Sequence, residues 1–261
     1  MRLPATIHQM ISQEPYKTDD YGMSASSVLV FQDKVLKIQE CGRESENEHR
    51  MMAWLQGKLP VPQVLSYEVQ EGSSYLLMSK VPGKMACDEE YMRDPARQAK
   101  LLSAGLKMLW AVDTAHCPGN WLLESKLAQA RYNVENNLVD MDNVEPDTFG
   151  EKGFQNPRAL LQWLCENRPQ EEPTLSHGDY CLPNLFGTGD EPCGYIDLGK
   201  AGIADKWCDI ALCYRSLSHN FSGRYHNQAY QGYDEMLLFR ELGLKPDWEK
   251  IRYYILLDEL F

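Results

Sequence analysis

The sequence predicts an α+β fold in which a small, sheet-rich N-terminal part precedes a larger, mainly helical part. Over the first 80 of the 261 residues, short apolar runs with strand-like alternation are separated by turn formers. From residue 94 onward, apolar residues recur at helical spacing. Such segregation of strands from helices is typical of α+β proteins. We expect an N-terminal lobe over residues 1–80, a hinge at the Val-Pro-Gly of residues 81–83 and a C-terminal lobe over residues 84–261.

The N-terminal lobe is expected to hold an antiparallel sheet and a helix packed on it. The predicted elements are a short helix within residues 1–16, a loop of small polar residues at 21–27, strands at 28–31, 34–38, 61–69 and 74–79, and a helix over 43–59. The loop matches neither GxGxxG nor a Walker A motif, so alone it is a weak phosphate-binding candidate. Backbone groups from Ser79 to Val81 can hydrogen-bond a nucleotide base, because a strand that enters a hinge leaves N–H and C=O groups unpaired.

A lysine and a glutamate of this lobe are predicted to pair. Strand alternation places Lys37 on the same face as Val35. The alternative interpretation is an ordinary, solvent-exposed lysine on a strand. Glu48 lies three and four positions before Met51 and Met52, so it points along the apolar face of its helix, where an unpaired carboxylate is costly. Glu44, one turn earlier, is the rival. Such a Lys–Glu pair holds the lysine against nucleotide phosphates in kinase folds.

The C-terminal lobe is expected to contain helices at 99–112, 122–138, 157–166, from about 206, and at the C-terminus. Between them, residues 140–147 form an acidic loop, either solvated or cation-binding, which lacks the glycine of a calcium loop. Asp209 is expected to have a structural role, either capping its helix or docking on a neighbouring loop, and Arg215 either packs or faces a substrate. The last helix ends in two acids and a carboxylate, which oppose the helix dipole and require water, an arginine or a cationic ligand as compensation.

The most specific signal lies between the helices. Asp179 sits in a glycine-containing turn, Asn184 follows five positions later, and Asp197 lies on a short apolar strand. Turn formers at 187–194 predict an antiparallel hairpin, and pairing Phe186 with Tyr195 would place Asn184 opposite Asp197. Few, hard oxygen ligands suit Mg²⁺ shared with nucleotide phosphates. A base for a hydroxyl and two metal ligands are what a phosphoryl-transfer enzyme requires.

Composition excludes several other classes of protein. Hydrophobic content of 43% and charged content of 25% are ordinary for a soluble globular protein. No apolar run is long enough to span a membrane and the N-terminus has no signal-peptide core, so a cytoplasmic location is expected. The eight cysteines form no CxxC pair, which argues against a zinc site or a disulfide framework. A net charge of −12 argues against nucleic acid and is compatible with a cationic substrate. We expect a monomer or weak dimer.

The sequence closely resembles the aminoglycoside 3′-phosphotransferases, enzymes with a bilobal protein-kinase-like fold. The resemblance covers nearly the whole chain. It is carried by the motifs HGDYCLPN at 177–184, IDLG at 196–199, ADKWCDIA at 204–211 and YYILLDELF at 253–261. The first two motifs are shared with other small-molecule kinases, whereas the C-terminal ending is far more particular.

The resemblance implies ATP-dependent phosphorylation of the 3′-hydroxyl of aminoglycosides of the kanamycin and neomycin type, which confers resistance. Asp179 would be the catalytic base, Asn184 and Asp197 would bind Mg²⁺, and Glu48 would hold Lys37 against the phosphates. Ser24 would lie over the phosphates, and Ser79 and Val81 would meet the adenine. The cationic aminoglycoside would be bound by Asp258, Glu259, the carboxylate of Phe261, Arg215, Asp140, Asp142 and Glu145.

Two departures and two alternative functions accompany this interpretation. Val35 stands where the similar enzymes stack an aromatic residue on adenine, so GTP is a possible cofactor beside ATP. Lys200 stands where they have an arginine, and lysine cannot make the same bidentate contact. The alternatives are a kinase of the same fold that acts on another small hydroxyl compound and a non-catalytic, nucleotide-binding pseudokinase. The acidic C-terminus favours a polycationic substrate over another small hydroxyl compound. The intact set of Lys37, Glu48, Asp179, Asn184 and Asp197 argues against a pseudokinase.

Overall fold

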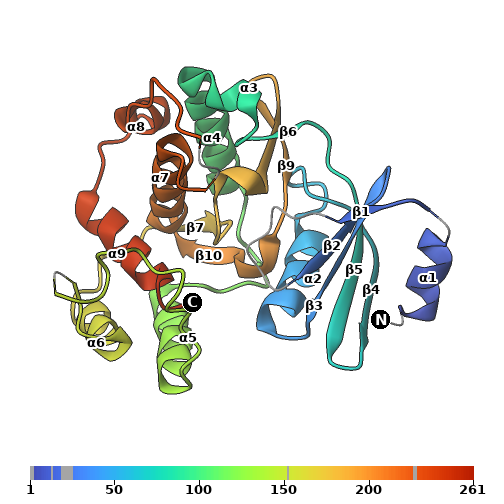
Figure 1. The fold of residues 1–261 in the computed structure, drawn as a ribbon, viewed down its shortest axis with the longest axis horizontal. Helices are drawn as coiled ribbons and strands as arrows, with labels where there is room; N and C mark the ends of the chain where they lie inside the picture. Colours follow the sequence, from blue (N-terminus) through green and yellow to red (C-terminus); the bar gives the residue numbers. More distant parts are fainter. Residues whose placement is uncertain (1–2, 13, 19–25, 152, 226–227) are drawn as a thin grey trace.

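The computed structural model describes residues 3–12, 14–18, 26–151, 153–225 and 228–261, and consists of a sheet lobe beside a helical lobe (Figure 1). The sheet has five antiparallel strands in the order β1-β2-β3-β5-β4. The strands are β1 Lys17–Thr18, β2 Ser27–Val30, β3 Lys34–Glu40, β4 Val64–Gln70 and β5 Ser73–Ser79. The four predicted strands of this region are therefore confirmed, and β1 is an additional short edge strand.

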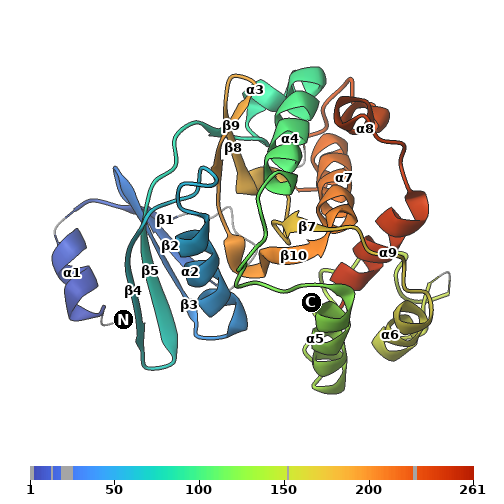
Figure 2. The same ribbon diagram turned by 180° about the vertical axis from the view of Figure 1, so that it is seen from behind.

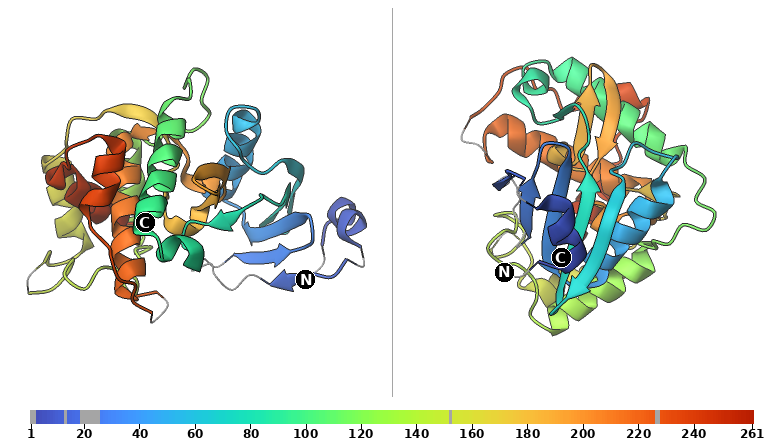
Figure 3. Two further views of the ribbon diagram at one scale, coloured as in Figure 1. Left: turned by 90° about the horizontal axis from the view of Figure 1, so that it is seen from above. Right: turned by 90° about the vertical axis from the view of Figure 1, so that its right-hand side faces the viewer.

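Two helices cover opposite faces of this sheet (Figures 1 and 3). Helix α1, Ala5–Ile11, packs Ile7 and Ile11 into a small core formed by the outer side chains of β3 and β5. Helix α2, Arg43–Leu55, lies between the sheet and the helical lobe, and its Met51, Met52 and Leu55 join the main core of the protein. The alternating faces of β3 and β5 explain this arrangement, because successive side chains point to opposite sides of a strand. Helix α2 thus contacts both lobes.

The helical lobe begins with β6, Lys84–Met85, directly after the segment predicted as a hinge. Its helices are α3 Glu89–Met92, α4 Pro95–Trp110, α5 Leu123–Glu135, α6 Pro157–Glu166, α7 Lys206–Ser222, α8 Met236–Leu242 and α9 Trp248–Asp258 (Figure 2). The predicted helices all occur, with shifted ends. The lobe bounds of 1–80, 81–83 and 84–261 stay a prediction. Within the described residues, no helix combines the length and the apolar character that crossing a bilayer requires.

Two small sheets carry the loops between these helices. Strand β7, Pro173–Ser176, pairs with β10, Gly202–Asp205, and β6 pairs with β8, Leu185–Thr188, which pairs with β9, Glu191–Tyr195. Short 3-10 turns, η1 Leu182–Asn184 and η2 Leu198–Lys200, precede β8 and β10. These sheets bring residues 177–184 and 196–201 together at the boundary between the lobes.

The predicted hairpin exists, but its predicted register is wrong by one residue. Leu185, and not Phe186, pairs with Tyr195, and the Ile196 N–H donates to the Asn184 carbonyl at 3.1 Å. Residues 187–194 are mostly strand, and only a tight turn at residues 189–190 joins β8 to β9. The tight turn lies nearer the start of this segment than its middle, which moves the pairing two residues from the predicted register, and a bulge between Phe186 and Gly187 restores one of them. Asn184 therefore lies opposite Ile196, one residue before Asp197.

Candidate active site

The loop after β7 is held by one buried carboxylate from α7. Asp209 Oδ2 accepts the His177 N–H at 2.8 Å, and Oδ1 accepts the Gly178 N–H and the Ser176 hydroxyl, both at 2.9 Å. Asp209 is fully buried, and burial raises its pKa, whereas these hydrogen bonds act to lower it. Asp205, not Asp209, caps α7 through the Trp207 N–H. The predicted structural role of Asp209 is confirmed: it docks on the loop that carries Asp179.

Both carboxylate oxygens of Asp179 have partners within this loop. Asn184 Nδ2 donates to Asp179 Oδ2 at 2.9 Å and also to the Asp179 carbonyl at 2.9 Å. The Cys181 thiol donates to Oδ1 at 3.1 Å. Burial raises the pKa of the Cys181 thiol well above its usual value, so it stays protonated and can donate. Asp179 is half-buried, so its carboxylate is oriented and still accessible to a hydroxyl group.

Asp197 is joined to this loop through its neighbour Ile196. The Ile196 carbonyl accepts a hydrogen bond from His177 Nε2 at 2.9 Å, and its N–H bonds to Asn184. Asp197 does not lie on a strand, as predicted, but after the end of β9; it adopts the left-handed conformation, with φ 59° and ψ 56°, which is uncommon for a residue with a Cβ. Such conformations persist where the surrounding structure enforces them, and they cluster at functional sites.

The predicted Lys37–Glu48 pair is present and extends to Asp197. Lys37 Nζ lies 2.9 Å from Glu48 Oε2 and 2.6 Å from Asp197 Oδ1. Glu48 is 1% exposed, whereas its rival Glu44 is exposed. Burial lowers the pKa of Lys37, but the two carboxylates outweigh that effect and raise it, so the lysine stays charged. The cation therefore lies between α2 and the Asp197 turn.

The free oxygens of this cluster fit Mg²⁺. Since both Asn184 Nδ2 bonds go to Asp179, the amide presents Oδ1, and Asp197 presents Oδ2; no other described residue bonds to either oxygen. In the part of the chain that the structure describes, no group of three or more His, Cys, Asp or Glu residues forms a metal site. Mg²⁺ does not need one, because it keeps several waters and commonly takes one or two protein ligands together with phosphate oxygens.

The segment predicted to meet the adenine retains one free backbone donor. The Ser79 N–H donates to the Gln63 carbonyl at 2.9 Å, and the Ser79 hydroxyl accepts the Gln63 N–H at 2.8 Å. The Val81 N–H bonds to no group among the residues described. Ser24, predicted to lie over the phosphates, falls outside the described residues.

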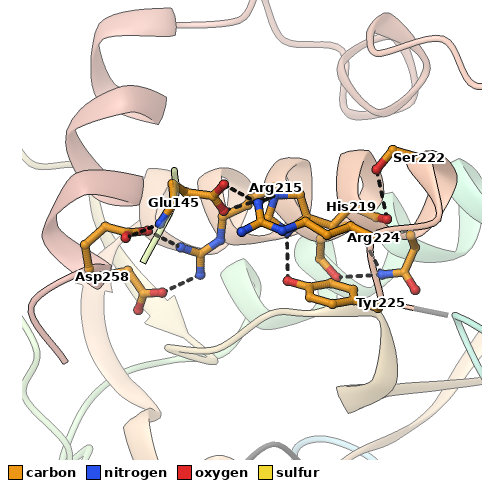
Figure 4. A network of polar contacts seen from close by, with 10 residues as sticks. Glu145, Arg215, His219, Ser222, Arg224, Tyr225 and Asp258 are labelled. Carbon is orange, nitrogen blue, oxygen red and sulfur yellow. Dashed lines mark hydrogen bonds and ion pairs between the residues drawn. The ribbon is translucent and has the colours of Figure 1, made fainter. Parts of the chain in front are cut away.

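The acids at the end of α9 are paired with an arginine from α7 (Figure 4). Arg215 contacts Asp258, and its Nη1 lies 3.2 Å from Glu259 Oε1. Burial raises the pKa of Asp258, but the charges of Arg215 and Lys200 outweigh it and hold the pKa below its usual value. The compensation that the helix end requires is thus supplied by the protein itself.

The acidic loop is attached to this arginine cluster through Glu145. The Glu145 N–H donates to Glu259 Oε2 at 2.8 Å, and its carboxylate contacts Arg224 and lies 3.0 Å from His219 Nε2 (Figure 4). Asp140 is exposed and accepts the Asp142 N–H at 3.1 Å, which stabilises a turn. Glu145 is therefore drawn to the α9 end, whereas Asp140 and Asp142 stay in the exposed part of the loop.

Several residues of the site were not predicted. Cys181 lies inside the quoted motif, and its position two residues after Asp179 was a signal that could have been used. His219 and Arg224 lie far from Glu145 in the sequence, so only the tertiary structure reveals their contact. The ring of Phe261 lies 5.5 Å from Lys200 Nζ and 5.7 Å from Lys126 Nζ, which places two cations beside the C-terminal residue.

Comparison with known proteins agrees with this geometry. A model of the phosphotransferase enzyme family matches residues 20–254. An aminoglycoside 3′-phosphotransferase from Enterococcus faecalis is 38% identical over 274 residues, covering 100% of this chain and 99% of that protein. One from Campylobacter jejuni is 41% identical over 219 residues, covering 83% and 81%.

Solved structures confirm the predicted bilobal protein-kinase-like fold. An aminoglycoside-3′-phosphotransferase of type VIII superposes with a TM-score of 0.80 at 26% identity, covering 98% of this chain and 97% of the other. APH(3″)-Id from Streptomyces rimosus gives a TM-score of 0.79 at 23% identity, covering 97% and 95%, which bears on the fold alone. The chain belongs to the phosphotransferase enzyme family and, within it, to the aminoglycoside 3′-phosphotransferases.

Proposed function

We propose that the protein transfers the γ-phosphoryl group of ATP to the 3′-hydroxyl of aminoglycosides of the kanamycin and neomycin type, and so confers resistance to them. The observation that carries the proposal is the convergence of Asp179, Asn184, Asp197 and the Lys37–Glu48 pair at the lobe boundary. Each group has the chemistry that phosphoryl transfer requires, and the curated relatives are named for this reaction.

Asp179 orients the substrate hydroxyl and accepts its proton as the hydroxyl oxygen attacks phosphorus. The Asn184 and Cys181 bonds fix the carboxylate plane, which limits the orientations that the hydroxyl can take. Lys37 offsets negative charge on the phosphates from its place beside Asp197. Asn184 Oδ1 and Asp197 Oδ2 would hold Mg²⁺, which when bound neutralises charge on the transferring group.

Nucleotide binding is assigned to the strand end and the segment after it. The Val81 N–H is available as a donor, and the Ser79 carbonyl would accept from the base amino group. Ser24 is proposed to cover the phosphates. Val35 offers no aromatic ring for stacking, so the base is held mainly by these backbone groups, and GTP remains a second possible cofactor.

The aminoglycoside is assigned to the acidic end of the helical lobe. Asp258 and Glu259 supply two carboxylates beside Arg215, and the Phe261 carboxylate and the loop acids Asp140, Asp142 and Glu145 would extend the site. Substrate ammonium groups would share these carboxylates with Arg215. The protein is proposed to work in the cytoplasm as a monomer or weak dimer, without nucleic acid or membrane partners.

One assay tests the reaction and its acceptor together. ADP release from ATP and Mg²⁺ is measured with kanamycin, its 3′-deoxy analogue, neomycin, a macrolide and choline in parallel. We expect release with kanamycin and neomycin only. ADP release with 3′-deoxykanamycin would show that a hydroxyl other than the 3′-hydroxyl is the acceptor. Release with choline or the macrolide would favour another kinase activity. No release with any compound would favour a non-catalytic protein.

A further inference from the structure

Asn47 lies beside Glu48 on α2, but it contacts the turn that follows Asp197. Its side chain is 3% exposed, and Nδ2 donates to the Gly199 carbonyl at 2.9 Å and to the Ala201 carbonyl at 2.8 Å. We call residues 197–201 the Asp197 turn. Both donor hydrogens of the amide are therefore used to hold the backbone of this turn against α2.

The Asp197 turn needs such support, because Asp197 is in the left-handed conformation. Within the turn, the Ala201 N–H donates to the Leu198 carbonyl at 3.1 Å. Among the described residues, two polar connections join α2 to the turn. In one, Lys37 forms ion pairs with both Glu48 and Asp197. In the other, the Asn47 side chain hydrogen-bonds directly to the backbone of the turn.

The two connections differ in what a ligand does to them. In the proposed function Lys37 contacts the nucleotide phosphates, so its contact with Asp197 must be shared with, or given up to, the phosphates. The Asn47 bonds involve no group assigned to a ligand, and a pair of buried amide–carbonyl bonds is costly to break. The backbone connection therefore persists when the side-chain connection changes.

We propose that Asn47 is a positioning residue that keeps Asp197 in its metal-binding orientation while Lys37 engages the nucleotide. This inference rests on the proposed function. It predicts that loss of the Asn47 donors weakens the contribution of Mg²⁺ to nucleotide binding, and leaves Mg²⁺-free nucleotide binding and aminoglycoside binding unchanged.

The test uses the full chain and calorimetric binding of a non-hydrolysable ATP analogue with and without Mg²⁺, and of kanamycin. Asn47→Leu removes both donors at similar volume, and Asn47→Ser retains one shorter donor and serves if the leucine variant does not fold. Gln98→Leu is the matched control, because Gln98 is also a buried amide and donates to the Ala86 carbonyl at 2.7 Å, within the helical lobe.

We expect Asn47→Leu to reduce the Mg²⁺-dependent enhancement of nucleotide affinity about tenfold, with a smaller reduction for Asn47→Ser. Mg²⁺-free nucleotide affinity and kanamycin affinity should change less than about twofold, and Gln98→Leu should keep the full enhancement. An unchanged enhancement in the Asn47 variants, or an equal loss of every affinity, overturns the inference alone. Absence of any Mg²⁺ enhancement in the unmodified protein would instead contradict the proposed function and the inference together.

Discussion

The reaction centre and the acidic end of α9 are built in contrasting ways. Around Asp179, buried side chains hydrogen-bond to the backbone, and Asp209 alone holds three groups of the loop. At the acidic end, ion pairs between side chains predominate: Arg215 and Arg224 hold the partly exposed carboxylates of Asp258 and Glu145, and only the buried Glu259 also accepts a backbone N–H. Backbone bonds to buried groups fix geometry, whereas partly exposed ion pairs exchange partners at little cost. The fixed geometry around Asp179 suits a single reaction, and the exchangeable ion pairs at the end of α9 suit a cationic substrate that must bind and leave.

The largest expected effect concerns the base. Asp179→Asn keeps the shape of the side chain and removes the proton acceptor, so turnover should fall about 10²–10⁴-fold, or about 3–5 kcal/mol. Steady-state kinetics with kanamycin measures the loss. Asp190→Asn, at the exposed turn of the β8–β9 hairpin, is the matched control and should retain turnover. A variant at Asp179 with most of the original turnover would remove its assignment as the base.

The rigidity of the reaction centre is tested at Asp209. Asp209→Ala leaves the buried His177 N–H and Ser176 hydroxyl without their acceptor and removes one of the two acceptors of the Gly178 N–H, so the free energy of unfolding should fall by about 2–4 kcal/mol. Denaturant unfolding measures this change. Glu124→Ala removes an exposed ion pair with Arg168 and should cost less than about 1 kcal/mol. Equal losses in the two variants would contradict the contrast between the regions.

Substrate recognition is tested at Asp258. Asp258→Ala removes a carboxylate and leaves Arg215 less neutralised, so kanamycin affinity should fall about tenfold, or about 1.4 kcal/mol. Binding of the ATP analogue should not change, and calorimetry measures both. Glu249→Ala removes an exposed acid at the other end of α9 with the same change in net charge. Loss of nucleotide affinity at Asp258, or equal loss of kanamycin affinity at Glu249, would count against the assigned substrate site.

The smallest effect concerns how the stability of the folded protein depends on pH through His219, which contacts Glu145. His219 faces Glu145, Arg224, Arg215 and Tyr225, and burial lowers its pKa below the usual value. As the pH falls below about 6.5, the unfolded chain binds a proton that the folded His219 resists, so stability declines. His219→Gln should flatten the dependence of melting temperature on pH between about 5 and 7. An unchanged slope would show that His219 does not supply this dependence.

The sequence predicted those parts of the site that depend on local pattern and on the cost of unpaired charge. Helical phase and the penalty for a buried carboxylate were enough to choose Glu48 over Glu44 and to pair it with Lys37. Turn composition located the hairpin but not its register, because turn formers occur throughout residues 187–194 and do not show that the tight turn lies at 189–190 or that a bulge follows beside Phe186.

Contacts between distant segments were the least predictable. Periodicity could not decide what neutralises Asp258 and Glu259, and the structure identifies Arg215. The Arg224 contact with Glu145 joins residues from different elements, for which the sequence contains no pattern. The contact of Asn47 was also not predictable, because its partners lie 152 and 154 residues away in the sequence and helical phase indicated only Glu48 as the buried polar residue of α2.

Gly178 has a consequence for how resistance can evolve. It has φ +82°, and the Lys200 carbonyl oxygen lies 1.9 Å from where a Cβ would be, so any side chain would push the loop of Asp179 away from the Asp197 turn. Gly57 has a similar φ of +76° but nothing within 4 Å. In a saturation library selected for bacterial growth on kanamycin, we expect position 178 to retain only glycine, whereas position 57 should also accept asparagine. Sequencing of the survivors would reveal whether drug pressure can reshape this junction, and recovery of alanine at 178 would show that it can.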